Sequence, residues 1–105
     1  MKFRDEKVES AIMRLAAEFI RLEAGPASLI TVTGVHFEDR ANRAKIMVTI
    51  LPDTAEKHAL EFLNRQRGEL ADYIRDHIRM RSVPLLSFAI DLGEKNRQRI
   101  DELGA

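Results

Sequence analysis

Cysteine is absent from this sequence of 105 residues. Without cysteine, the chain has no disulfide framework, no thiolate ligand for a metal ion and no cysteine nucleophile. This composition fits a protein of a reducing compartment.

Long apolar segments are absent as well. No window approaches the roughly 20 apolar residues that a membrane-spanning helix needs. The first ten residues hold no apolar stretch long enough for a signal peptide. We therefore expect a soluble, cytoplasmic protein without a membrane partner.

An excess of charge of one sign is also lacking. The 17 Lys and Arg residues balance the 17 Asp and Glu residues, so the net charge is zero. Net charge therefore does not indicate a nucleic-acid partner, and any basic surface must come from the placement of the charges.

Motifs of catalytic or cofactor chemistry do not occur. The chain has no Gly-x-Ser-x-Gly, no Walker phosphate-binding loop and no dinucleotide fingerprint. Its three histidines, His36, His58 and His77, lack the spacing of metal ligands. We expect no enzyme activity, no cofactor, no metal ion and no small-molecule substrate.

What the sequence does contain is the apolar patterning of one small domain, which we place at residues 1–105. Apolar residues at steps of three and four predict a helix from about Asp5 to Ala24. Its stripe consists of Val8, Ile12, Leu15, Phe19 and Leu22, widened by Ala11, Ala16 and Ile20. Gly25 and Pro26 end this helix.

Two strands are predicted next, at Leu29–Glu38 and Arg43–Leu51, with a turn between them. The apolar phase of the first strand shifts at Gly34, where a β-bulge would restore the inward orientation. In the second strand Lys45, Met47 and Thr49 point away from the core, which makes them a solvated sheet face or an extension of a binding surface.

A helical pair follows the second strand. Asp53 and Glu56 have the spacing of a capping box. The apolar phase continues across Gly68 to about Met80, which predicts two helices joined by a kink at Gly68 rather than by a loop. Gly68 itself has two possible roles, close packing of the helices and access for a ligand.

The C-terminal part predicts a strand at Leu86–Ile90 and a short helix or tail over residues 92–105. In that helix Ile100 and Leu103 are the expected apolar anchors. The order helix, strand, strand, kinked helix pair, strand predicts an α+β fold with two layers, a three-stranded sheet with helices on one face.

This order is that of type II KH domains, and the local sequence is more specific. The segment Arg79–Phe88, with the sequence RMRSVPLLSF, resembles the Arg-x-Arg-x-x-Pro-x-Leu-x-Phe signature of the ribosome-binding factor A family. That family has an Ala-x-Gly kink where other KH domains have a Gly-x-x-Gly loop. The matching residues here are Gln66, Arg67 and Gly68, so the glycine is kept and the alanine is replaced. A basic position of the family after the kink falls on Ala71.

The resemblance implies a monomeric assembly factor that binds the 30S ribosomal subunit through 16S rRNA near the decoding region. It also implies that the factor promotes late maturation and processing of the rRNA 5′ end without catalysis. Charged residues on a helix are usually a solvated surface, but the resemblance favours an RNA-binding role for one group of residues. These are Lys45, Arg65, Gln66, Arg67, Gly68, Arg75, Arg79 and Arg81.

Two alternatives stay open on the sequence. The chain could be a generic KH-like RNA-binding module that serves other RNAs. It could also be a protein-interaction domain that has lost RNA binding, which the zero net charge and Ala71 would favour.

Overall fold

The computed structural model describes residues 2–80 and 82–104, with side chains described from residue 7 to 103 except at 81. Its chain forms four α-helices, three strands and one 3₁₀ turn within those residues. Their bounds are α1 Lys2–Glu23, β1 Leu29–Glu38, β2 Arg43–Leu51, η1 Asp53–Ala55, α2 Glu56–Arg65, α3 Arg67–His77, β3 Leu85–Ile90 and α4 Leu92–Gly104.

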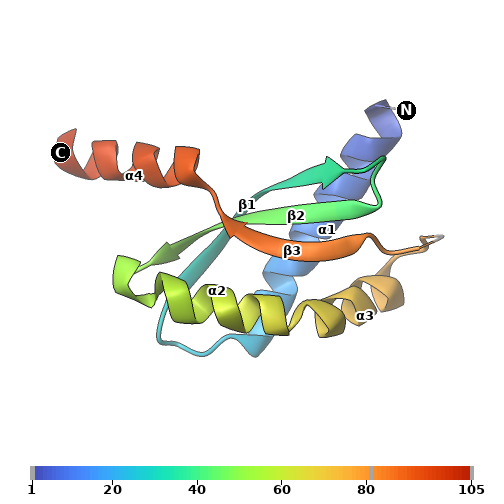
Figure 1. Ribbon diagram of the computed structural model, residues 1–105, viewed down its shortest axis with the longest axis horizontal. Coiled ribbons are helices and arrows are strands. Elements are labelled where there is room, and N and C mark those ends of the chain that lie inside the picture. The colour runs from blue at the N-terminus through green and yellow to red at the C-terminus, as the bar shows by residue number, and fades with distance from the viewer. Residues whose placement is uncertain (1, 81, 105) are drawn as a thin grey trace.

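The three strands form one sheet in the order β1-β2-β3. β1 and β2 are antiparallel, and β3 runs parallel to β2. Figure 1 shows α1 and the α2–α3 pair against the sheet, while α4 projects away from it. The predicted two-layer α+β fold is confirmed.

The bulge in β1 lies where the apolar phase of the sequence shifts. Register with β2 changes between Val32 and Gly34. Val35 is buried beyond the bulge, and Val32 before it also packs on the core, because the extra residue returns the inward phase. Both predicted strand ranges agree with the structure.

Helix α1 buries its stripe against the sheet, with one exception. Ile12 and Leu15 are fully buried, but Leu22 is 65% exposed. Leu22 lies in the last turn at the border of the stripe, so its predicted place in the core is wrong. The buried core as a whole consists of Ile12, Leu15, Ala16, Phe19, Ile20, Val35, Ala44, Ile46, Val48, Ile50, Leu63, Leu70, Ile74, Leu86 and Phe88.

The capping box predicted at Asp53 and Glu56 does not form. The chain makes a 3₁₀ turn first, and neither the turn nor α2 has a side-chain cap. Both carboxylates instead face cations from α4. The Asp53 Oδ2 to Arg99 distance is 3.2 Å, and Glu56 Oε2 lies 2.7 Å from Lys95 Nζ.

The helical pair is kinked as predicted, but two residues earlier. Gln66 leaves helical geometry with φ −88° and ψ 1°, and its N–H donates to the carbonyls of both Phe62 and Leu63. Gly68 lies inside α3. Because a single residue departs from the helix, the apolar phase passes from Leu63 to Leu70 and both are buried.

Helix α3 ends at His77, before the predicted end at Met80. Ile78 takes an extended conformation, with φ −138° and ψ 150°. In an extended segment, residues two apart point to the same side. Ile78 and Met80 therefore both pack on the core, which continued helix would not allow.

Candidate nucleic-acid interface

An open groove of about 1050 Å³ runs between the kinked helix pair and β3. One wall comes from α2 and the start of α3, and the other from β3 and the segment before it. The lining residues are Lys57, Leu60, Glu61, Asn64, Arg65, Arg67, Gly68, Ala71, Val83, Pro84, Leu85 and Leu86. The floor is therefore largely apolar, and the charged side chains come from the helices.

Asn64 fixes the helix wall to the strand wall. Its Oδ1 accepts the N–H of Phe88 at 3.0 Å, and its Nδ2 donates to the carbonyls of Phe88 at 3.4 Å and Leu60 at 3.2 Å. The outer edge of β3 is thus held at Phe88. On a strand, residues two apart direct their backbone N–H and carbonyl groups to the same side. Leu86, two residues before Phe88, therefore directs its N–H and carbonyl toward the groove.

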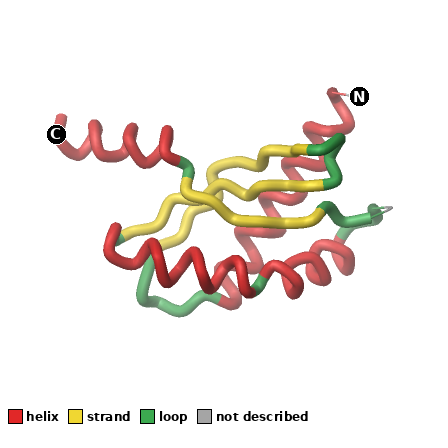
Figure 2. Tube along the Cα trace, viewed as in Figure 1, coloured by secondary structure: helices red, strands yellow, loops and turns green. Residues whose placement is uncertain are grey.

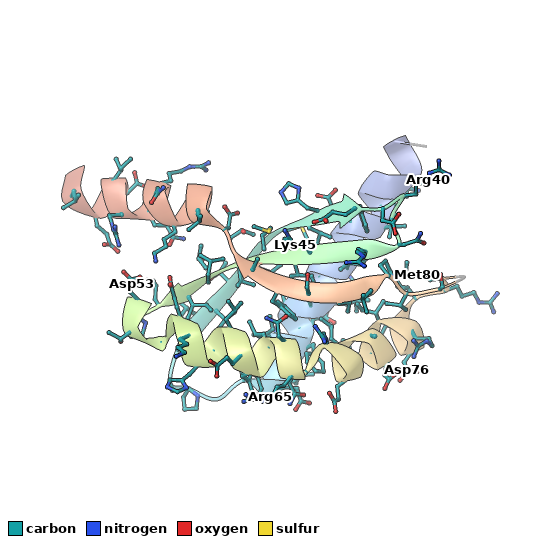
Figure 3. The ribbon with its side chains drawn as sticks, viewed as in Figure 1. Arg40, Lys45, Asp53, Arg65, Asp76 and Met80 are labelled. Atoms are coloured by element: carbon teal, nitrogen blue, oxygen red, sulfur yellow. The ribbon has the colours of Figure 1, made fainter. Side chains whose placement is uncertain are left out.

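Three cations at the groove are free of carboxylate partners. No ion pair among the described side chains involves Lys57, Arg65 or Arg67, and all three are exposed. Figure 3 shows Arg65 at the end of α2, pointing away from the sheet. Glu61 is the acidic residue in the lining. The helix wall is therefore a net positive strip beside an apolar floor.

Gly68 has open space around it. A Cβ atom built there would meet no heavy atom within 4 Å, and its φ is not in the left-handed region. The close-packing role considered for this glycine is therefore wrong. The backbone of Gly68 is accessible from the groove, which suits the approach of a bulky ligand.

The predicted site residues fall into three groups. Arg65, Arg67 and Gly68 line the groove, and Gln66 forms the kink between them. Arg75 and Arg79 are exposed outside the lining, and Arg75 is paired with Asp72 at 2.7 Å. The other two predicted residues are Lys45, on the opposite face of the sheet, and Arg81, which lies outside the described residues.

On that opposite sheet face, the expected solvent exposure holds only in part. Lys45 pairs with Glu38 at 3.4 Å, and Met47 is half-buried. Thr49 is 4% exposed, since α4 covers this end of β2. Figure 3 shows Lys45 on the sheet, apart from Arg65 and the kink.

Several groove residues were not predicted as part of the site. Lys57, Asn64 and Ala71 follow the same three- and four-residue spacing as Gly68, which places them on one face of the helix pair. The Val83–Leu86 segment belongs to the signature from which we took only the arginines. The apolar end of that signature was the signal that could have identified the second wall of the groove.

The three histidines lie on three different elements, His36 on β1, His58 on α2 and His77 on α3. His36, His58 and His77 are all exposed, and His77 stacks on Tyr73 with ring centroids 4.1 Å apart. Among the residues that the structure describes, no three potential ligands gather around a common point. Nor does any described helix have the length and apolarity to cross a membrane.

The sequence matches the family model of Ribosome-binding factor A over residues 4–104. This chain belongs to the ribosome-binding factor A family. Ribosome-binding factor A of Geotalea uraniireducens is 32% identical over 103 residues, covering 95% of this chain and 84% of the relative. That of Macrococcus caseolyticus is 31% identical, covering 98% of this chain and 96% of the relative.

Solved structures of ribosome-binding factor A share the fold. The crystal structure from Thermus thermophilus has a TM-score of 0.72 at 27% identity, covering 81% of this chain and 92% of that one. A Thermus thermophilus model fitted into a cryo-EM map of a 30S–RBFA complex has a TM-score of 0.69 at 27% identity, covering 79% and 90%. The predicted resemblance is thus confirmed, and members of this family act by binding and not as enzymes.

Proposed function

We propose that this chain is an assembly factor that binds the immature 30S subunit through its 16S rRNA. The observation that carries this is the groove, where the free cations Lys57, Arg65 and Arg67 stand around the open backbone of Gly68. A neutral protein offers RNA a local positive strip by leaving these cations without carboxylate partners.

The chemistry of the groove suits RNA that is not fully paired. Arginine guanidinium groups contact phosphates and stack on bases, and single-stranded segments can place bases on an apolar floor. Leu60 and Leu86 provide such a floor. Arg79 is an exposed cation outside the groove, and we include it and Arg81 on the resemblance alone.

Promotion of maturation needs no catalysis. A factor that binds one rRNA conformation more tightly shifts the population toward it. A tenfold preference corresponds to about 1.4 kcal/mol. On this basis the factor favours a late maturation state, supports rRNA processing and leaves the mature subunit.

Support comes from a similar protein whose fitted model belongs to a map of a 30S–RBFA complex. We infer that residues 1–105 act as one KH-like domain, with residues 92–105 as its short C-terminal helix or tail. We also infer that the protein is cytoplasmic, since ribosome assembly takes place in the cytoplasm of bacteria. We infer in addition that it is a monomer.

The test is sedimentation of the purified protein with isolated 30S subunits, 50S subunits and 70S ribosomes over a salt series. We expect selective association with 30S subunits that weakens as salt rises, because phosphate contacts release counterions. Equal binding to all three particles would indicate a generic RNA-binding module. No binding at low salt would contradict the RNA role.

The double variant Arg67→Glu with Arg79→Glu tests the assigned surface. We expect normal melting and an affinity for 30S subunits lowered by at least tenfold, with a reduced salt dependence. The matched control is Arg21→Glu with Arg40→Glu, two exposed arginines away from the groove that, like Arg67 and Arg79, take part in none of the ion pairs among the described side chains. Wild-type binding by the groove variant would show that the surface is wrongly assigned.

A further inference from the structure

Helix α4 presents an apolar stripe to solvent. Leu92, Ile100 and Leu103 are 65%, 67% and 82% exposed. At 100° per residue these three side chains and Asn96 fall within one narrow sector of the helix. Nothing of the described chain covers this stripe, and Figure 2 shows α4 standing apart from the other helices.

A different, polar face of α4, roughly a quarter-turn from the stripe, is the one that touches the body. Lys95, Gln98, Arg99 and Glu102 meet the end of β2 around a small cavity of about 40 Å³. Lys95 pairs with Glu56 at 2.7 Å, with both side chains about three-quarters buried. A helix held only by hydrophobic burial would turn its apolar stripe toward the body. The observed orientation of α4 therefore depends on its polar contacts.

The start of α4 is anchored as well. Asp91 Oδ1 accepts the N–H of Glu94 at 3.0 Å, as a helix cap, and Thr33 donates to Asp91 Oδ2 at 2.6 Å. These bonds lower the pKa of Asp91, chiefly through the Thr33 hydroxyl and then the Glu94 amide. Since Thr33 lies at the β1 bulge, the start of α4 is tied to the sheet, while Lys95 and Arg99 tie its next two turns to α2 and η1.

The charges of α4 disfavour RNA as the partner of this stripe. Each of its three cations has a carboxylate partner: Lys95 pairs with Glu56, Arg97 with Glu94 and Arg99 with Asp53. Asp101 and Glu102 add further negative charge near the exposed end. The paired cations of α4 contrast with the free cations at the groove, and they favour a protein surface as the partner of the stripe.

The size of the stripe disfavours a stable dimer through α4 alone. If each of the three apolar side chains buries about 100 Å² of surface, two copies together bury about 600 Å². Specific, stable protein interfaces bury about 1,200–2,000 Å². A patch of this size works best as a second contact to a partner that the protein already holds elsewhere.

We propose that the Leu92–Asn96–Ile100–Leu103 stripe of α4 docks on an apolar, weakly charged surface of a ribosomal protein of the small subunit. This rests on the proposed function, because the rRNA contact in the groove supplies the high local concentration. Asn96, in the middle of the stripe, requires a hydrogen-bonding group on the partner.

The test compares two ligands, intact small subunits and protein-free 16S rRNA, for the full chain. The variant is Leu92→Gln with Ile100→Gln and Leu103→Gln, which keeps charge and helix-forming residues. The control is Arg97→Gln with Asp101→Asn, outside the stripe on the same helix. Melting curves of both variants should match wild type, because all the altered side chains are exposed.

We expect the stripe variant to bind intact subunits at least tenfold more weakly than wild type, and protein-free rRNA equally well. Equal weakening toward both ligands, or no weakening toward either, would overturn the docking proposal. Self-association of the wild type at micromolar concentration that the variant abolishes would also overturn it, in favour of a second copy. If the wild type binds neither ligand, it is the proposed function that fails.

Discussion

The α2–α3 pair and α4 use the same kinds of residues in opposite ways. α2 and α3 bury Leu63, Leu70 and Ile74 and leave their cations free at the groove. α4 exposes its leucines and isoleucine and holds its cations in ion pairs. The comparison teaches that an apolar stripe indicates a covered face of a helix only when a neighbour is available to cover it.

The largest expected difference in stability is between a variant of the core and a variant of α4. Phe88 is 5% exposed, and Phe88→Ala should lower the free energy of unfolding by about 3–5 kcal/mol. Leu103→Ala on α4 should change it by less than about 0.5 kcal/mol. Urea unfolding of the two variants measures both values, and a similar loss for each would mean that α4 belongs to the core.

The contact between α2 and β3 should have the next largest effect. Asn64→Leu removes both hydrogen bonds to Phe88 and leaves its N–H without a partner, at a cost of about 1–3 kcal/mol. Amide exchange at Phe88 should become faster than in wild type. Unchanged exchange would show that the Asn64 contact does not protect this edge.

The cap of α4 gives a smaller effect that depends on pH. Asp91→Ala should cost about 1 kcal/mol at neutral pH, as loss of a helix cap does. The folded-state pKa of Asp91 lies below its ordinary 3.8, so this contribution is complete above that pH and is lost as the pH falls through the lowered value. Unfolding measured from pH 7 to pH 2 should therefore show the difference between variant and wild type shrinking in acid.

The smallest change in the free energy of unfolding is expected at Gly68, and there the substitution should stabilise the fold. Alanine there meets no neighbour and favours helix, so Gly68→Ala should stabilise the fold by about 0.5–1 kcal/mol. The added methyl group faces the groove, and affinity for 30S subunits should fall severalfold. Gly93→Ala, in the first turn of α4, is the matched control for added helix propensity. Unchanged affinity in the Gly68 variant would exclude close approach of RNA at this position.

Most of the fold could be predicted from periodicity. The strands β1 and β2, the bulge at Gly34 and the kinked helix pair were predicted because apolar alternation is a local signal. The failures occurred where a distant element decides the outcome. Asp53 and Glu56 have the spacing of a cap but bind cations about 40 residues further along the chain, and no local pattern shows that.

Of the two walls of the groove, only the helix wall was predicted from the sequence. The arginines around the kink could be selected from charge and from the family signature. The strand wall could not, because Val83 and Leu86 have the apolar character of any core strand. The role of Ile100 and Leu103 was predicted incorrectly, because apolar spacing in a helix carries no information on which face has a neighbour.

The bonds from Asn64 to Phe88 have a consequence for the behaviour of the protein in concentrated solution. β3 is an edge strand, and an uncovered edge can pair with the edge of another molecule and start aggregation. With a side-chain amide occupying the middle of that edge, the outward-facing backbone groups of β3 that are left for pairing are those of Leu86 and Ile90, separated by the occupied Phe88. A protein that must expose a groove beside its sheet thereby limits strand-to-strand association between its own copies.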